Sequence, residues 1–151
     1  MPRPKVTPFL WYDGQAEEAA RFYVSLFKAS RIVEVTPCPD GRAFVVEFEL
    51  AGTRFIALNG GPHFQLTEAI SLSVDCADQA EVDELWERLS AGGSPSRCGW
   101  LKDRYGLSWQ IVPSCLPRML SDRERSGAVT QALMKMGKIE IRELQEAYDG
   151  R

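Results

Sequence analysis

The sequence predicts an α+β protein made of two β-α-β-β-β modules, followed by C-terminal helices. One order of elements, a strand, a helix and then further strands, occurs twice along the chain. Such a repeat indicates duplicated structural units. The length of 151 residues suits one well-formed core but not two ordinary domains. We therefore expect a single domain over residues 1–151, with module one at about 5–60, module two at about 68–113 and a helical tail at about 114–150.

Module one reads as a strand, a helix and three strands. Residues 6–13, "VTPFLWYD", are rich in the aromatic and β-branched side chains that favour a strand. In "GQAEEAARFYVSLFKAS" apolar residues lie three and four positions apart, as on an amphipathic helix. The strand "RIVEVTPCP" is closed by Pro37 and Pro39, because proline cannot donate to a ladder. The last two strands form a hairpin about Ala51-Gly52.

Module two repeats this order. Residues 69–77 are a strand, and Asp78 is placed to cap the helix "QAEVDELWERLSA", which two glycines end. The segments "SPSRCGWLK" and "GLSWQIVP" supply two more strands on either side of a turn at residues 103–106. A short additional strand near Ser94 would complete the second β-α-β-β-β unit.

The tail after Pro113 changes to helical spacing. Gly137 separates two short predicted helices, and their apolar residues are Val129, Leu133 and Met136, then Ile141, Leu144 and Ala147. These apolar faces need a surface to cover, and either the edge of the sheet or a second subunit is available. We therefore expect a homodimer.

Composition excludes several classes of partner. Apolar residues make up 44% and charged residues 26%, the balance of a soluble globular protein. The net charge of −3 and the lack of a Lys/Arg run argue against a nucleic-acid or anionic-membrane surface. No apolar stretch approaches membrane-spanning length, so a cytoplasmic location is expected. The four cysteines form no C-x-x-C pair, which excludes a zinc knuckle or dithiol motif.

Three segments carry a resemblance to a known family: "PFLWYDGQAEEAARFY", "SLSVDCADQAEVDELWERLSAGG" and "CGWLKDRYGLSWQIVP". With the tail "ALMKMGKIEIRELQEAY", they resemble the PhnB-like branch of the vicinal oxygen chelate superfamily, which includes glyoxalase I, extradiol dioxygenases and bleomycin-resistance proteins. That branch has carried the label 3-demethylubiquinone-9 3-methyltransferase. The superfamily resemblance covers roughly Val6 to Pro113.

The resemblance implies that the two modules form a curved mixed sheet with a concave cup that holds a small-molecule ligand, often in a dimer. Metal-using relatives point four His or Glu ligands into the cup. The corresponding positions here are Pro8, Ala57, Ala69 and Gln110, and none of them is His, Glu, Asp or Cys. A divalent ion needs several charged or imidazole ligands. We therefore expect no metal and no cofactor.

Strand alternation gives candidate ligand-binding residues, because successive side chains point to opposite faces of a sheet. Trp109 and Ile111 are expected to face the helix, which leaves Gln110 on the concave side. The same reasoning predicts a concave, ligand-binding wall of Tyr12, Glu47, Phe55, Asn59, Ser71, Ser73, Ser108 and Gln110. The alternative is a partly solvated sheet face that the tail helices fill, since any one-sided sheet shows polar alternation.

Three residues are weak candidates for catalysis, and each also has a structural interpretation. Glu47 would transfer protons in a cup of low polarity, or it is a solvent-facing strand residue. His63, the only histidine, would be the natural base at neutral pH, or it is a solvated residue between the modules. Cys98 would be a nucleophile if a nearby cation activated its thiol, or it packs as a small apolar side chain.

The leading hypothesis is a metal-independent small-molecule-binding protein of the glyoxalase and bleomycin-resistance type. Whether it is an enzyme is left open. One alternative is a superfamily lyase, isomerase or dioxygenase that uses Glu47, His63 or Gln110, and another is an interaction module that binds a partner through the tail. Methyl transfer, which the family label suggests, is not favoured, because Gly60-Gly61 does not belong to a G-x-G-x-x-G loop that opens a helix.

Overall fold

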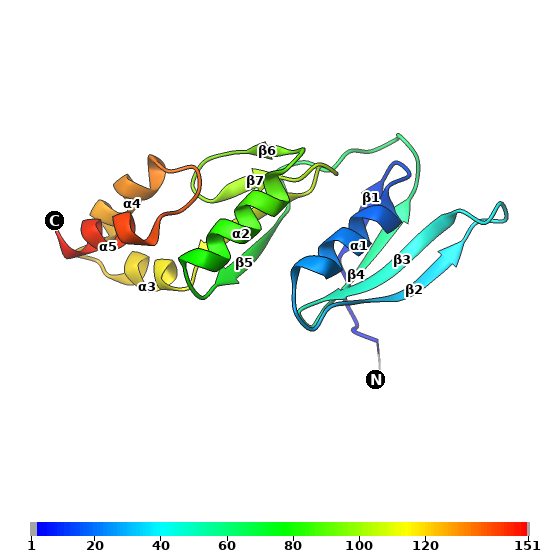
Figure 1. Cartoon of the computed structure of the whole chain (residues 1–151), viewed down its shortest axis with the longest axis horizontal. Coiled ribbons are helices and arrows are strands. Elements are labelled where there is room, and N and C mark those ends of the chain that lie inside the picture. Colours follow the sequence, from blue (N-terminus) through cyan, green and yellow to red (C-terminus); the bar gives the residue numbers. More distant parts are fainter. Residues whose placement is uncertain (1–2, 151) are drawn as a thin grey trace. The chain divides into compact units, whose positions relative to one another are not determined.

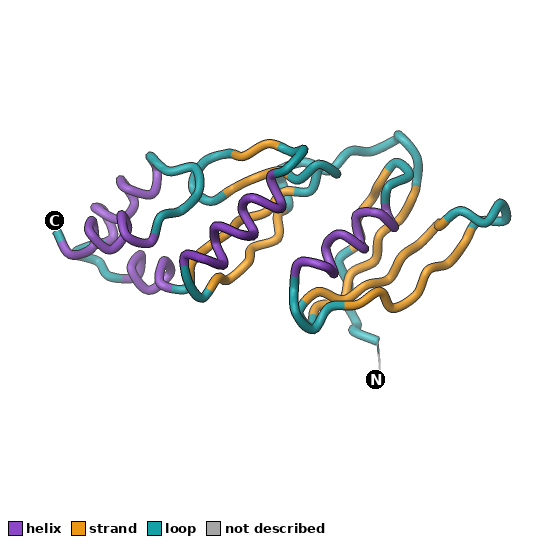
Figure 2. The backbone as a smooth tube through the Cα atoms, viewed as in Figure 1, coloured by secondary structure: helices purple, strands orange, loops and turns teal. Residues whose placement is uncertain are grey.

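The computed structural model describes residues 3–150 and consists of two compact units that divide between Leu66 and Thr67 (Figure 1). Each unit contains one four-stranded mixed sheet and a helix between its first two strands (Figure 2). The predicted α+β class and the repeated module are therefore confirmed. The expectation that the whole chain forms one domain stays a prediction.

Unit one contains the elements β1 Phe9–Tyr12, α1 Ala16–Leu26, β2 Arg31–Pro37, β3 Ala43–Leu50 and β4 Thr53–Asn59. The strand order is β1-β4-β3-β2, with β1 parallel to β4 and the other neighbours antiparallel. Strand β1 is shorter than the predicted 6–13. The predicted hairpin joins β3 to β4, and its turn residues Ala51 and Gly52 have φ values of 47° and 90°. Positive φ at both central positions is the geometry of a tight two-residue hairpin turn.

Helix α1 packs through small side chains. Its buried residues are Ala16, Ala19, Ala20 and Tyr23. Because alanine is small, the helix axis can approach the sheet closely, and Tyr23 supplies the one large side chain that fills the space between them. Glu17 and Glu18 lie in the first turn, where negative charge complements the helix dipole.

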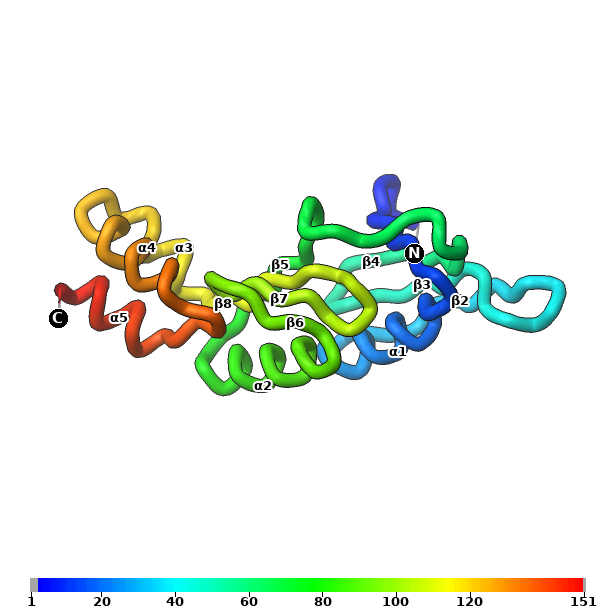
Figure 3. Tube along the Cα trace, turned by 90° about the horizontal axis from the view of Figure 1, so that it is seen from above, coloured from blue at the N-terminus to red at the C-terminus, as the bar shows by residue number. Residues whose placement is uncertain are grey.

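Unit two contains β5 Ser71–Cys76, α2 Gln79–Ser90, β6 Ser94–Pro95, β7 Trp100–Lys102 and β8 Ser108–Pro113. Its strand order is β5-β8-β7-β6, with β5 parallel to β8. The Asp78 carboxylate accepts a hydrogen bond of 2.9 Å from the backbone N–H of Glu81, so the predicted helix cap is confirmed. The short strand β6 is the additional strand expected near Ser94. Figure 3 shows α1 and α2 each lying along one face of the sheet of its own unit.

The turn between β7 and β8 is built around one buried carboxylate. Asp103 is 2% exposed. Its Oδ1 accepts hydrogen bonds from the backbone N–H groups of Tyr105 and Leu107, at 2.8 and 3.0 Å. Its Oδ2 accepts a third from the Trp109 indole Nε1, at 2.9 Å. These bonds tie the turn to the strand that follows it.

The tail forms three helices, α3 Cys115–Ser121, α4 Ser126–Met134 and α5 Ile141–Asp149, where the sequence predicted two. Helix α3 was missed because it is short and contains Pro117, which is tolerated only in the first turn of a helix. The buried apolar residues of the tail form one cluster: Leu116, Met119, Val129, Met136, Ile139 and Leu144.

Hydrogen bonds join the tail to the rest of unit two. The Gln79 side chain donates to Ile139 O at 3.0 Å and accepts from the Ile141 N–H at 2.7 Å. The Cys98 and Gly99 N–H groups donate to the carbonyls of residues 136 and 137, both at 2.9 Å. Among the described residues, no helix has the length and apolar character to span a bilayer.

Candidate functional site

Contacts with α1 identify the inner face of the unit-one sheet. The Tyr12 hydroxyl lies 3.2 Å from that of Tyr23 on α1. The Phe48 ring lies 6.2 Å from the Tyr23 ring and 5.4 Å from the stacked Phe55 ring, measured between centroids. Asn59 Oδ1 accepts a 2.8 Å hydrogen bond from the N–H of Ala16, the first residue of α1. All four strand side chains therefore face the helix.

The expectation that Tyr12, Phe55 and Asn59 line the face opposite the helix is wrong. Both faces of β1 and β4 carry large apolar side chains, so the alternation of polar and apolar residues did not mark a core side. Asn59 is polar, but it faces the helix because its amide is used twice. It accepts from the first residue of α1 and donates to Ala43 O at 2.9 Å.

The outer face of the unit-one sheet, opposite α1, combines apolar and charged side chains in three cross-strand rows. They are Phe9–Ile56–Glu47–Glu34, Trp11–Leu58–Val45–Thr36 and Arg54–Glu49–Arg31. Glu49 forms an ion pair of 3.1 Å with Arg31. Glu47 is only 7% exposed and forms an ion pair with Arg3, whose own side chain is 70% exposed.

The outer face of the unit-two sheet is hydrogen-bonding in character. Leu101, Trp109 and Ile111 are at most 1% exposed and belong to the buried face, which α2 covers. The opposite face carries Ser71, Ser73, Ser108 and Gln110, which we call the polar strip. The Gln110 amide Nε2 donates to the Ser71 hydroxyl at 3.0 Å. These four residues are the unit-two part of the predicted ligand-binding set, and their role in binding stays a prediction.

Ser108 is the unusual member of the polar strip. It is 1% exposed, and its hydroxyl has no hydrogen-bond partner among residues 3–150. A buried polar group without a partner is unfavourable by about 1 to 3 kcal/mol. Natural proteins keep such groups rarely, and often where a ligand or an ordered water completes the bonding.

Two residues beside the polar strip were not among the sequence candidates. Trp100 is the Cα partner of Gln110, and Lys102 is the Cα partner of Ser108, so both share the face of the strip. Lys102 forms an ion pair with Glu68. The alternation of "WLK" around the buried Leu101 was a signal that could have found them.

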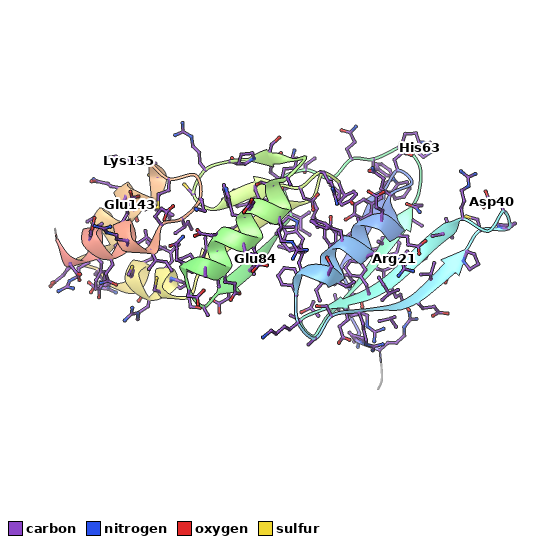
Figure 4. The ribbon with its side chains drawn as sticks, in the orientation of Figure 1. Arg21, Asp40, His63, Glu84, Lys135 and Glu143 are labelled. Atoms are coloured by element: carbon purple, nitrogen blue, oxygen red, sulfur yellow. The ribbon has the colours of Figure 1, made fainter. Side chains whose placement is uncertain are left out.

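The remaining catalytic candidates are members of neither outer-face group. His63 is exposed and projects from the connection after β4 (Figure 4). Within residues 3–150 it has no hydrogen bond or ion pair to orient it as a base. Cys98 is half-buried in a turn with φ 60°. Lys102, a cation close to Cys98 in sequence, forms an ion pair with Glu68. Among the described residues, Glu47 and His63 of unit one form no hydrogen bond or ion pair with each other, and Cys98 belongs to unit two.

The residues at the implied metal positions do not fit a divalent ion. Pro8, Ala57 and Ala69 have no donor side chain, and Ala57 is 0% exposed on the face toward α1. The neighbouring residues, whose side chains face away from α1, do not provide a metal site either. The outward positions of β1 and β4 are Phe9, Trp11, Arg54, Ile56 and Leu58. Among the described residues, no group of three or more His, Cys, Asp or Glu side chains is arranged to hold a metal.

A separate open pocket of about 630 Å³ lies between the start of α2 and helix α5. Its lining includes Gln79, Glu140 and Arg142. None of the candidate site residues lines it. Its side chains are largely paired with one another, as in the 3.2 Å bond from Arg142 to Glu146, and we assign it no role.

Comparison with known proteins gives a consistent result. The model of the family described as 3-demethylubiquinone-9 3-methyltransferase matches residues 4–112. The chain is 33% identical to a solved protein from Bacillus cereus described as a putative 3-demethylubiquinone-9 3-methyltransferase, PhnB protein. That alignment covers 73% of this chain and 99% of the other, with a TM-score of 0.69. No curated protein matches the chain.

Two more distant solved structures share the fold alone. Protein PA1353 from Pseudomonas aeruginosa is 18% identical over 74% of this chain and 98% of its own, with a TM-score of 0.62. The genomically encoded fosfomycin resistance protein FosX from Listeria monocytogenes is 16% identical over 80% of this chain and 98% of its own, with a TM-score of 0.58.

Two mixed sheets, each with one helix-covered face, define an α+β protein of the glyoxalase-like fold. Within that class the chain belongs to the PhnB-like family described as 3-demethylubiquinone-9 3-methyltransferase. The resemblance found in the sequence is therefore confirmed.

Proposed function

We propose that this protein binds a small organic molecule directly through its side chains, without a metal ion. The observation that supports this most strongly is the Ser108 hydroxyl, which is buried without a partner among the described residues and lies in a cross-strand row with Ser71 and Lys102. Three hydroxyls and an amide can hydrogen-bond a ligand that carries oxygen atoms, and the Lys102 ammonium, which has three N–H donors, can add a bond beside its ion pair with Glu68. Trp100 adds a flat apolar surface beside Gln110.

Neither enzyme alternative gains support from the geometry. A lyase, isomerase or dioxygenase would need an oriented base or a metal, and the positions of Glu47, His63 and Gln110 provide neither. Methyl transfer is not proposed, although the family description names it. Gly60 and Gly61 follow β4 and lead into the connection rather than into a helix, so they do not form a cofactor-binding loop.

The interaction-module alternative also loses its main argument. The apolar side chains of α3, α4 and α5 pack mainly on one another, with Val112 and other partly buried residues against them. Their apolar faces therefore need no partner to cover them. We still propose a homodimer, because each described sheet has open edge strands that could pair with a second copy. The cytoplasmic location also stays a prediction.

The test is a binding screen by native mass spectrometry against a library of small oxygenated metabolites, with a chelator present throughout. We expect at least one specific hit that is lost in Ser108→Ala and in Gln110→Ala. Ser25→Ala is the matched control, because Ser25 is an exposed serine of α1 whose hydroxyl, within the described residues, bonds only its own helix, by donating to Phe22 O at 2.6 Å. A hit that requires added metal, or that survives both strip substitutions, would contradict the proposal.

A further inference from the structure

Besides the Ser108 hydroxyl, a second buried polar group, the Glu47 carboxylate on the outer face of unit one, indicates a ligand site. The Glu47 side chain is 9% exposed, yet its ion-pair partner Arg3 is 70% exposed and comes from the segment that precedes β1. Burial of a carboxylate is expensive unless a cation and hydrogen bonds compensate. Here the compensating cation is held from the solvent side by a short peptide arm, residues 4–8.

The surroundings of Glu47 define the chemistry that would replace Arg3. Glu47 is flanked across β4 and β1 by Ile56 and then Phe9, and Phe9 is 55% exposed. Two strand spacings, about 10 Å, separate Glu47 from Phe9. A group of that length has its cationic end at the carboxylate and its apolar body over Ile56 and the Phe9 ring.

The charge on this face also favours a cation. Besides Arg3, its strand positions carry the carboxylates Glu34, Glu47 and Glu49 and the guanidinium groups Arg31 and Arg54. Arg31 is engaged by Glu49. Arg54 is the Cα partner of Glu49, and within residues 3–150 it forms no ion pair with Glu47. Without Arg3, the strand positions of this face carry three carboxylates and two guanidinium groups, so the face is net negative around Glu47.

We propose that the outer face of unit one binds an organic cation, an ammonium or guanidinium group with an apolar body, at Glu47, and that Arg3 occupies this site in the free protein as an internal competitor. This site goes beyond the function proposed for the polar strip and does not depend on it. Because Arg3 is exposed, we expect the equilibrium constant between its paired and unpaired states to be about 1 to 5, as for ion pairs at protein surfaces. An external cation therefore displaces Arg3 at low cost.

The experiment is an NMR titration of the full chain with 4-phenylbutylamine, protonated at pH 7, and with 4-phenylbutan-1-ol as the uncharged probe of the same shape. Removal of the competitor in Arg3→Ala should tighten binding of the amine about two- to sixfold. The reason is that the apparent association constant increases by a factor of one plus the equilibrium constant for formation of the Arg3–Glu47 ion pair. Glu47→Gln should weaken it at least about tenfold through loss of the charged acceptor. Glu49→Gln, a glutamate on the same strand and face, should stay within about twofold of the wild type.

Several results would overturn the proposal: the alcohol binding as tightly as the amine, Arg3→Ala leaving the affinity unchanged, or Glu49→Gln weakening binding as much as Glu47→Gln. The Arg3→Ala measurement stays informative even if Glu47→Gln does not fold, because Arg3 is exposed and its replacement should not disturb folding. Perturbed amides should map to β1, β3 and β4. This separates the result from the polar strip, where the readouts are Ser108 and Gln110 in unit two.

Discussion

Replacement of Asp103 by asparagine should destabilise the protein strongly, because this side chain accepts three hydrogen bonds while 2% exposed. Asparagine keeps one oxygen for the backbone N–H groups of Tyr105 and Leu107. Its amide NH₂ then faces the Trp109 indole N–H, which places two donors against each other. The bond lost is to a charged acceptor, worth about 1.5 to 3 kcal/mol, and a buried indole N–H is left without an acceptor at a similar cost.

These effects overlap, and removal of a buried charge recovers some desolvation energy, so we expect Asp103→Asn to lower the free energy of unfolding by about 2 to 4 kcal/mol. Urea unfolding followed by tryptophan fluorescence measures it as a lower midpoint at unchanged slope. Asp75→Asn is the control, since Asp75 is exposed and, within residues 3–150, its carboxylate accepts a hydrogen bond only from the Ser114 hydroxyl, at 2.7 Å. We expect this control within about 0.5 kcal/mol of the wild type. A change equally small in Asp103→Asn would refute the anchoring role of the carboxylate.

Three further predictions concern the fold. Gly99→Ala should cost about 1 to 3 kcal/mol in thermal or urea unfolding, because Gly99 has φ +84° and an added Cβ would lie 2.7 Å from Ile139 Cδ1; an unchanged midpoint would show that the tail can shift. Burial raises the pKa of the Cys76 thiol to about 12 from the ordinary 9.0. Above pH 9 the thiol therefore ionises only in the unfolded chain, so its contribution to the free energy of unfolding is complete below pH 9 and is lost as the pH rises toward 12. The stability difference between the wild type and Cys76→Ala should therefore shrink between pH 8 and pH 10.5, and a constant difference would contradict this. Light scattering at micromolar concentration should give twice the chain mass of 16.9 kDa, whereas the mass of a single chain would exclude the homodimer.

The sequence predicted the elements better than the faces of the first sheet. Helix α2 was predicted to begin after Asp78, because a capping residue directly precedes an apolar stripe, and it does. In β5 and β8 small polar and large apolar residues alternate, so the side chains that share the face of Gln110 could be deduced. In β1 and β4 both faces are apolar, and the assignment of Tyr12 and Phe55 failed by one residue.

Other features depend on contacts between distant residues and leave no local pattern. The ion pair of Glu47 with Arg3 joins residues far apart in sequence, and the burial of Ser108 depends on the chain around it. The buried carboxylate of Asp103 was part of a recognised turn string, but turn chemistry alone does not reveal its bond to the Trp109 indole. These are the features on which the proposed ligand sites and the stability of the turn depend.

The measurement that tests the central claim most directly is the NMR response of the Gln110 side-chain amide to a metabolite hit, with a chelator present. Gln110 Nε2 already donates to the Ser71 hydroxyl, at 3.0 Å, so a ligand on the polar strip must change the environment of these two protons. We predict a saturable shift of the Gln110 amide signals together with the backbone signals of Ser71, Ser73 and Ser108. Saturable binding that leaves all of these signals unmoved, or that disappears with the chelator, would contradict direct, metal-independent binding at the polar strip.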